Sequence, residues 1–160
     1  DIACKALEGF KGTHRRLEFV GQKDGVSVID DFAHNPDKIA ASLSALKQHE
    51  GRLLLVFQPH GFGPTKMLRE GLVESFVTGM SEEDILYMPE IYYAGGTANK
   101  VISSQDIIDD VNTKGRQGIF CGTRADIIPL IQAEKKSGDR IVVMGARDDT
   151  LTQFCHEFLV

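Results

Sequence analysis

Several residue types and motifs are scarce or missing in this sequence, and each absence excludes a class of protein. Tryptophan is absent, and the 160 residues include only five prolines and three cysteines. The cysteines form no CxxC pair, so we expect neither a zinc site nor a disulfide framework from Cys4, Cys121 and Cys155. No apolar run approaches the roughly 20 residues that cross a bilayer, and no signal-peptide pattern is present. We therefore expect a cytoplasmic protein in a reducing compartment, with no membrane partner and no metal site of its own.

Positive charge is also too sparse for a nucleic-acid surface. Lys and Arg number 18 against 23 Asp and Glu, which gives a net charge of −5 at pH 7. The basic residues are scattered and form no stripe that could follow a phosphate backbone. We expect no nucleic-acid partner. With 42% hydrophobic residues, a chain of this length can bury the core of one domain.

Three motifs of common enzyme sites are missing as well. The sequence has neither the P-loop pattern GxxxxGK[ST] nor the dinucleotide fingerprint GxGxxG, and no serine lies in a GxSxG elbow. Gly61-Phe62-Gly63 begins like the fingerprint, but the third glycine is absent and Pro64 lacks a backbone donor, so we interpret it as a turn. A nucleotide bound by this chain needs its phosphate loop from elsewhere.

The most informative stretch that is present runs from Val26 to Pro36 and reads VSVIDDFAHNP. Its β-branched beginning predicts a buried strand that ends at Asp30 and Asp31, and Asn35 before Pro36 predicts a helix start. In open α/β sheets this carboxyl edge of the strands binds ligands, helped by the positive end of the following helix. The structural alternative is that one acid caps the helix and the other lies in water.

A hairpin is predicted to precede that stretch. The extended runs 15–20 and 26–29 are joined by a turn that contains Asp24-Gly25, a strong hairpin signal. Antiparallel pairing could bring Arg15 and Arg16, near the start of the first strand, close to the acids that end the second.

Beyond the hairpin, predicted strands and helices alternate, which is typical of an α/β fold. We predict a Rossmann-like, mostly parallel sheet with an N-terminal β-hairpin and helices on both faces. The loops 31–35, 59–65, 90–96 and 145–149 should then meet at one edge of the sheet. The further strands are expected at 53–57, 85–88, 118–121 and 140–144. Helices are expected to begin at Pro36, after a Thr65 cap and at a Ser103–Asp106 capping box, and the last helix is expected around Leu151–Leu159. A further helix is expected to begin at about Thr123 or at Asp126, and Pro129 favours the later start.

The side chains at this edge suit a nucleotide held from one side. Arg16 could hold a phosphate oxygen in forked geometry, and Asp31 could accept both hydroxyls of a ribose. His60 could hydrogen-bond or stack beside a base. The complementary half of such a site must lie elsewhere.

Three stretches together resemble the C-terminal domain of Mur ligases, the ATP-dependent enzymes that add amino acids or peptides to UDP-N-acetylmuramate. They are FKGTHRRLE at 10–18, GVSVIDDFAHNP at 25–36 and VFQPH at 56–60. The fifteen positions between Arg16 and Asp31 match the separation of the family's arginine and aspartate. The resemblance implies that residues 1–12 end a linker or helix from an absent central domain and that residues 13–160 form the Mur ligase C-terminal domain.

The resemblance also implies roles for single residues. These are a catalytic contact to the phosphates for Arg16, a ribose contact for Asp31, contacts near the nucleoside for His34 and Asn35, and contacts with the incoming amine for Phe32 and His60. ATP and Mg²⁺ are the implied cofactors, held mainly by the central domain. The implied substrates are UDP-N-acetylmuramate and an L-amino acid or peptide, joined through an acyl phosphate. Isolated from the central and N-terminal domains, this domain is expected to be inactive.

The amine substrate stays open at this stage. RRLE and DDFAHNP are similar to the ligases that reattach murein tripeptide, whereas QPH is similar to the ligases that add L-alanine. Gly61 and Pro64 occupy positions at which the L-alanine enzymes usually carry basic residues.

Three other interpretations compete with this one. A folylpolyglutamate-like ligase domain fits the loop after the second strand poorly, and a non-catalytic nucleotide-binding α/β module would carry the same edge without turnover. A signalling receiver domain needs a phosphoacceptor Asp after the next core strand and a Lys after the last. The sequence has Gln58–His60 and Gly145–Arg147 there instead.

Overall fold

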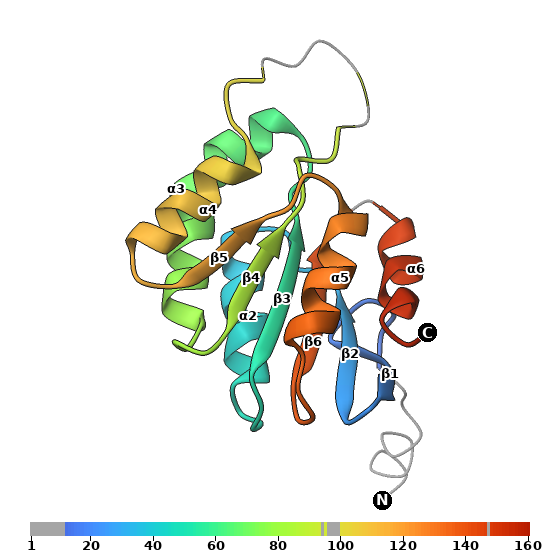
Figure 1. Cartoon of the computed structure of the whole chain (residues 1–160). Coiled ribbons are helices and arrows are strands. Elements are labelled where there is room, and N and C mark those ends of the chain that lie inside the picture. Colours follow the sequence, from blue (N-terminus) through green and yellow to red (C-terminus); the bar gives the residue numbers. More distant parts are fainter. Residues whose placement is uncertain (1–11, 94, 96–99, 147) are drawn as a thin grey trace, which may run out of the picture.

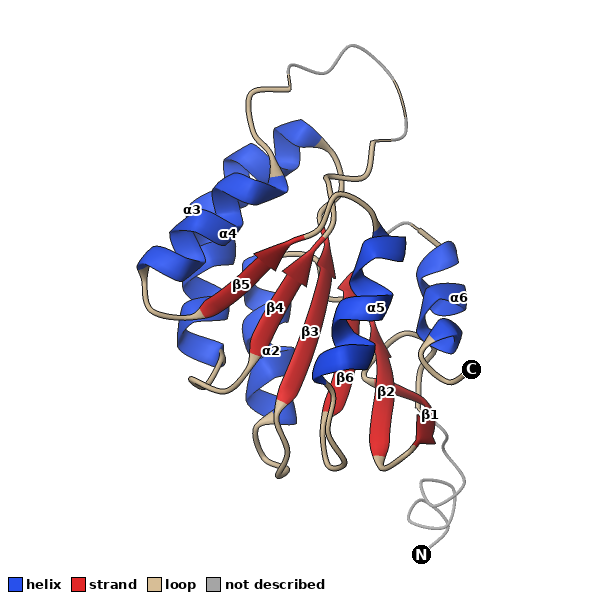
Figure 2. Ribbon diagram, in the orientation of Figure 1, coloured by secondary structure: helices blue, strands red, loops and turns tan. Residues whose placement is uncertain are grey.

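A six-stranded sheet with helices on both faces forms the body of the molecule (Figures 1 and 2). The structure is a computed structural model that describes residues 12–93, 95, 100–146 and 148–160, so the end of a linker or helix expected at 1–12 lies almost wholly outside the described residues. β1 and β2 pair antiparallel and the other neighbouring strands are parallel, which confirms the predicted α/β class. The strands are β1 (Glu18–Lys23), β2 (Val26–Asp31), β3 (Leu53–Gln58), β4 (Ile85–Met88), β5 (Gln117–Phe120) and β6 (Arg140–Gly145).

The predicted hairpin is confirmed. Asp24 and Gly25 have φ angles of 53° and 79°, the positive values expected at the central positions of a tight type I′ turn. Glu18 pairs with Asp30 across the hairpin. Arg15 and Arg16 therefore lie just before β1, beside the carboxyl end of β2.

Each face of the sheet has its own hydrophobic core. Helices α2 (Pro36–Leu46), α3 (Phe62–Gly79) and α4 (Ser104–Thr113) cover one face, and α5 (Arg124–Glu134) and α6 (Thr150–Glu157) cover the other (Figure 1). Strand β3 contributes to both cores because its side chains alternate: Leu53, Leu55 and Phe57 pack on one face, Leu54 and Val56 on the other. This burial on both faces explains the unbroken apolar run at 53–57.

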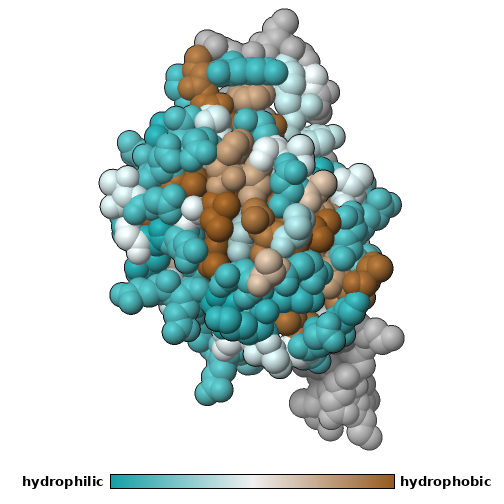
Figure 3. Space-filling model, viewed as in Figure 1, coloured by the Kyte–Doolittle hydropathy of each residue, from teal (hydrophilic) through white to brown (hydrophobic). Residues whose placement is uncertain are grey.

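Polar residues cover most of the face that carries α5 and α6, and hydrophobic residues gather in its middle beside α5 (Figure 3). Hydrophobic surface of this extent is usual for a folded protein. None of the helices in the described part of the chain is both long enough and apolar enough to cross a membrane.

Helix α3 begins earlier than predicted. α3 begins at Phe62 after Gly61, whose φ of 78° ends the extended segment, and Thr65 lies inside the helix with its hydroxyl donating to the Gly61 carbonyl at 2.7 Å. The predictions of a Thr65 cap and of a simple turn at 61–63 are therefore wrong. α5 begins at Arg124 with Thr123 as its N-cap, which confirms the earlier of the two predicted starts. Thr123 and Asp126 form a reciprocal capping box, which outweighs the donor missing at Pro129. The capping box predicted at Ser103–Asp106 is confirmed at the start of α4.

The order of the strands creates a crevice at one edge of the sheet. The order is β1-β2-β6-β3-β4-β5, so the last strand of the chain lies between β2 and β3. The loops after β2 and β3 lead to α2 and α3 on one face of the sheet, whereas the loop after β6, between them, leads to α6 on the other face. Ligands of open α/β sheets bind at such a switch point, outside the carboxyl ends of the strands. This edge is the upper one in Figure 1.

Candidate functional site

A cavity of about 510 Å³ lies at the carboxyl ends of β2, β6 and β3. Its walls come from the loop after β2, the end of β3 with its following loop, the first half of α3 and the residue after β6. The lining residues are Phe32, His34, Phe57, Pro59, His60, Pro64, Thr65, Leu68, Leu72 and Ala146. Three residues selected from the sequence, Phe32, His34 and His60, thus share one cavity. Among the described lining residues, the two histidines are the only ionisable side chains.

Arginine side chains lie beside the Phe32 wall of this cavity. The guanidinium carbons of Arg16 and Arg15 are 4.9 and 5.2 Å from the centroid of the Phe32 ring. Arg16 is exposed, and it forms no ion pair with any described residue. An exposed guanidinium of this kind can offer its forked donors to an anion at the rim of the cavity.

Asp31 is buried next to the arginine turn, with 3% of its surface exposed. Its Oδ1 accepts a hydrogen bond from the backbone N–H of Leu17 at 3.3 Å, and its Oδ2 accepts one from the hydroxyl of Ser42 at 2.5 Å. A carboxylate offers about four lone-pair sites, so these bonds leave acceptor capacity. The contact with Leu17 places Asp31 beside the backbone that carries Arg16.

The ion pair formed at the end of the hairpin joins Arg15 and Asp30. Arg15 Nε lies 3.1 Å from Oδ1 of Asp30, which is fully buried, and the Thr152 hydroxyl donates to Oδ2 at 2.7 Å. The expected approach of the arginines to the acids is thus confirmed for Arg15. The structural alternative is wrong, because both acids are buried and neither caps α2.

His60 forms the opposite wall of the cavity and carries an unpaired polar atom. Its ring lies against that of Tyr92, with centroids 5.3 Å apart, and a parallel bridge joins the two residues. The Nδ1 atom is buried and has no hydrogen-bond partner within the described ranges. Buried polar atoms are usually bonded, so this one suits a cavity that receives a hydrogen-bonding ligand.

The remaining two predicted residues make local contacts. His34 Nδ1 pairs with the Phe32 carbonyl at 2.8 Å, and the ring meets that of Phe32 edge-on at a centroid distance of 5.2 Å. The Asn35 side chain accepts the Lys38 N–H at 3.0 Å, which confirms the predicted helix cap. Asn35 does not line the cavity.

The sequence did not reveal the α3 wall of the cavity, which Pro64, Thr65, Leu68 and Leu72 supply. These residues face the cavity because α3 begins directly after Gly61. Pro64 was the available signal, since proline is well tolerated in the first turn of a helix.

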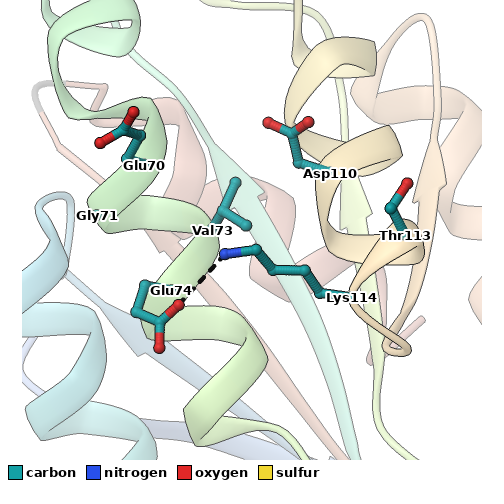
Figure 4. A pocket seen from close by; sticks show the side chains of 7 residues that line it. All are labelled: Glu70, Gly71, Val73, Glu74, Asp110, Thr113 and Lys114. Carbon is teal, nitrogen blue, oxygen red and sulfur yellow. Dashed lines mark hydrogen bonds and ion pairs between the residues drawn. The ribbon is translucent and has the colours of Figure 1, made fainter.

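A second hollow, of about 620 Å³, lies between α3 and α4, and three of the four charged side chains that line it, those of Glu74, Asp110 and Lys114, are paired with protein groups. Figure 4 shows Lys114 reaching from α4 to Glu74 on α3, at 3.3 Å. Asp110 pairs with Arg69 at 2.7 Å. These contacts join two helices and give the hollow a structural explanation.

Other reactive groups are remote from the cavity or buried. Among the residues described, no group of three His, Cys, Asp or Glu side chains could hold a metal ion. Cys121 and Cys155 are free and buried, and burial raises the pKa of the Cys121 thiol to about 11. A thiol with so high a pKa is a poor nucleophile near neutral pH.

Comparisons with known proteins give one consistent family. The family described as "Mur ligase, glutamate ligase domain" matches residues 15–147. The UDP-N-acetylmuramate–L-alanine ligase of Clostridium tetani is 39% identical over 145 residues, which are 90% of this chain and 31% of that protein. The chain thus spans about a third of the length of such curated relatives.

Solved structures show the same fold. The UDP-N-acetylmuramate–alanine ligase of Thermotoga maritima superposes with a TM-score of 0.72 at 23% identity, over 97% of this chain and 31% of that one. A murein peptide ligase of Psychrobacter arcticus gives 0.71 at 25% identity, over 98% and 32%. A bifunctional folylpolyglutamate synthase of Yersinia pestis, complexed with AMPPNP and a manganese ion, gives 0.60 at 13% identity, over 92% and 31%. The folylpolyglutamate-like interpretation is therefore not favoured.

Proposed function

This chain belongs to the Mur ligase family through its glutamate ligase domain, and on that premise we propose that it is the C-terminal domain of an ATP-dependent UDP-N-acetylmuramate ligase of peptidoglycan synthesis or recycling. We assign this domain to residues 13–160. The central and N-terminal domains of the same protein would supply the phosphate loop and the UDP-N-acetylmuramate site. We place the magnesium that accompanies ATP in the central domain, as the family resemblance implies.

The observation that carries this proposal is the position of the cavity. Phe32, His34 and His60 meet at the switch point of the sheet, with the exposed guanidinium of Arg16 beside them. The chain contains no phosphate loop of its own. One half of a nucleotide site, open toward a second domain, accounts for both facts.

In the proposed reaction, ATP activates the muramoyl carboxylate as an acyl phosphate, and the incoming amine attacks it to give an amide, ADP and phosphate. Two anions must approach each other in the first step, so positive charge lowers its barrier. Arg16 would contribute that charge by contacting the phosphates, and Asp31 would orient the ribose. Closure of this domain over the nucleotide would keep water from the acyl phosphate.

We place the incoming amine against Phe32 and His60. The curated relative named above acts, by its name, with L-alanine, whereas one structural neighbour is a murein peptide ligase. Among the described residues that line the cavity, none is a Lys or Arg that could hold a carboxylate. A kinetic comparison of L-alanine with murein tripeptide in the full-length protein would decide between the two amines.

The test of the nucleotide site is Asp31→Asn in the full-length ligase. Loss of a charged hydrogen-bond partner for the ribose should raise the KM for ATP about tenfold, with little change in the KM for UDP-N-acetylmuramate. An initial-rate assay with each substrate varied in turn measures both constants.

The matched control is Asp139→Asn, at the opposite edge of the sheet. Asp139 is also buried, at 5% exposure, and also accepts a backbone N–H. We expect this variant to lose stability without a change in either KM. An unchanged ATP dependence in Asp31→Asn would remove Asp31 from the nucleotide site.

A further inference from the structure

We propose that Arg15 is a positioning residue that fixes the Arg16 guanidinium in the geometry needed to receive ATP and holds the Phe32 ring beside it. This inference rests on the proposed function of Arg16. Arg15 itself is buried, with 5% of its surface exposed, and its guanidinium donates to protein acceptors.

The Arg15 side chain joins three separate parts of the molecule. Its Nε donates to Asp30 Oδ1 at the end of β2, at 3.1 Å. Its Nη2 donates to the Gly145 carbonyl at the end of β6, at 2.9 Å, and its Nη1 to the Asp148 carbonyl before α6, at 3.4 Å. One planar group thus connects the turn before β1 with two strand ends that border the cavity.

Hydrogen bonds also fix the backbone around Arg15. Arg15 and Leu17 both have positive φ angles, 53° and 47°, which cost energy for residues with a side chain and persist only where contacts hold them. The Arg15 carbonyl accepts the Phe32 N–H at 2.8 Å, and the Leu17 N–H donates to Asp31. Arg16 lies between these two anchored residues.

The same contacts place Phe32. Both guanidinium groups lie over its ring, so a shift of Arg15 would move the ring and the Arg16 side chain together. A lysine at position 15 would keep the positive charge opposite Asp30 but could not reach all three acceptors, because its single ammonium group lacks the fork of arginine. Arg15→Lys therefore perturbs position rather than charge.

The chain contains a matched control for this substitution. Arg140 is another buried arginine, at 9% exposure, and it donates to the carbonyls of Leu46, His49 and Gly51. It stands at the start of β6, at the edge of the sheet opposite the cavity. Arg140→Lys removes the same kind of buried fork without touching Arg16 or Phe32.

The experiment is a double-mutant cycle in the full-length ligase, with ATP kinetics and melting temperature measured for each variant. We expect Arg15→Lys to raise the KM for ATP about fivefold while the KM for UDP-N-acetylmuramate stays within about twofold, since the displaced group acts on one substrate only. In the Arg16→Ala background, Arg15→Lys should change the KM for ATP no further. Arg140→Lys should lower the melting temperature and leave both KM values unchanged.

Each outcome is decisive. Equal KM values for Arg15→Lys and Arg140→Lys, or independent effects of the Arg15 and Arg16 substitutions, would overturn the positioning role while leaving the proposed function intact. An unchanged KM for ATP in Arg16→Ala alone would overturn the proposed role of Arg16 and this inference with it. If Arg15→Lys does not fold, Asp30→Asn, which weakens the same ion pair at almost constant volume, is tested against Arg140→Lys by the same criteria.

Discussion

Asp139 is a buried carboxylate at the edge of the sheet opposite the cavity, where Arg52 donates to its two oxygens at 3.2 and 2.7 Å. Burial raises the pKa of this carboxyl, but the hydrogen bonds from Arg52 and from the Lys136 N–H outweigh burial and hold the pKa below its ordinary value. A carboxyl with a pKa lowered by folding stabilises the fold above its unfolded pKa of about 3.9. This contribution is lost as the pH falls through the folded value.

We therefore expect the stability difference between the wild type and Asp139→Asn to depend on pH. The variant should melt below the wild type at pH 7, and the gap should narrow from about pH 4 downward as the wild-type carboxyl is protonated. Melting curves between pH 7 and pH 3 measure the effect. Glu83→Gln, at an exposed acid, is the control and should melt at the wild-type temperature throughout this range. A difference in melting temperature between the wild type and Asp139→Asn that does not change with pH would contradict the lowered pKa of Asp139.

At the residue scale, the sequence predicted that arginines and acids lie close together at the end of the hairpin, but not which arginine pairs with which acid. Two arginines stand before β1 and two acids end β2, so the pairs Arg15–Asp30 and Arg16–Asp31 have the same separation along the chain. Only the positive φ angles at Arg15 and Leu17 decide that Arg15 turns inward and Arg16 outward. Such conformations depend on tertiary contacts, which spacing alone does not contain.

At the scale of single elements, helix α2 links the fold to the site. It begins directly after the residues that line the cavity, and the Asn35 side chain caps it. We expect Asn35→Ala to lower the free energy of unfolding by about 1 kcal/mol, since the Lys38 N–H loses its acceptor. Asn35→Asp should restore the loss, because a carboxylate accepts the same bond and favours the positive end of the helix.

Chemical denaturation measures the free energy of unfolding of both variants. Ser103→Ala, at the N-cap of α4, serves as the comparison, and we expect it to lose a similar amount of stability. An Asn35→Ala variant as stable as the wild type would contradict the capping role. The KM for ATP of the Asn35→Asp variant of the full-length ligase distinguishes a capping role of Asn35 from the proposed contact of Asn35 with the nucleoside. A capping residue alone would leave that KM unchanged.

Elements with strong local signals were predicted well, and those decided by backbone conformation were not. The apolar run 53–57 and the capping residues Asn35 and Ser103 identify their elements by composition and hydrogen-bonding chemistry. The start of α3 depends on the positive φ of Gly61, which the sequence permits without requiring it. The α3 wall of the cavity was missed for this reason.

At the scale of the whole molecule, alternating elements predict the sheet but not the order of its strands. β6 pairs with both β2 and β3, so residues more than a hundred positions apart become neighbours, as Ser27 and Arg140 do. This insertion brings Ala146 to the cavity beside Phe32 and His60. The carboxyl edge, with the loop 145–149 at it, was therefore predictable as a site, whereas the position of that loop between the loops after β2 and β3 was not.

The architecture of the whole molecule also determines which properties we expect of the isolated chain. Its two hydrophobic cores, one on each face of the sheet, should let the 160 residues fold and unfold cooperatively on their own. The edge at β2, β6 and β3 would, on the proposed function, contact a nucleotide from one side only, and the sequence lacks a phosphate loop. We therefore expect feeble ATP binding and no amide synthesis. Calorimetric titration with ATP and product analysis with UDP-N-acetylmuramate and L-alanine or murein tripeptide measure both properties, with the full-length ligase as the positive control. Amide formation by the isolated chain would show that these residues activate the carboxylate by themselves, which contradicts the proposed division of the site between two domains.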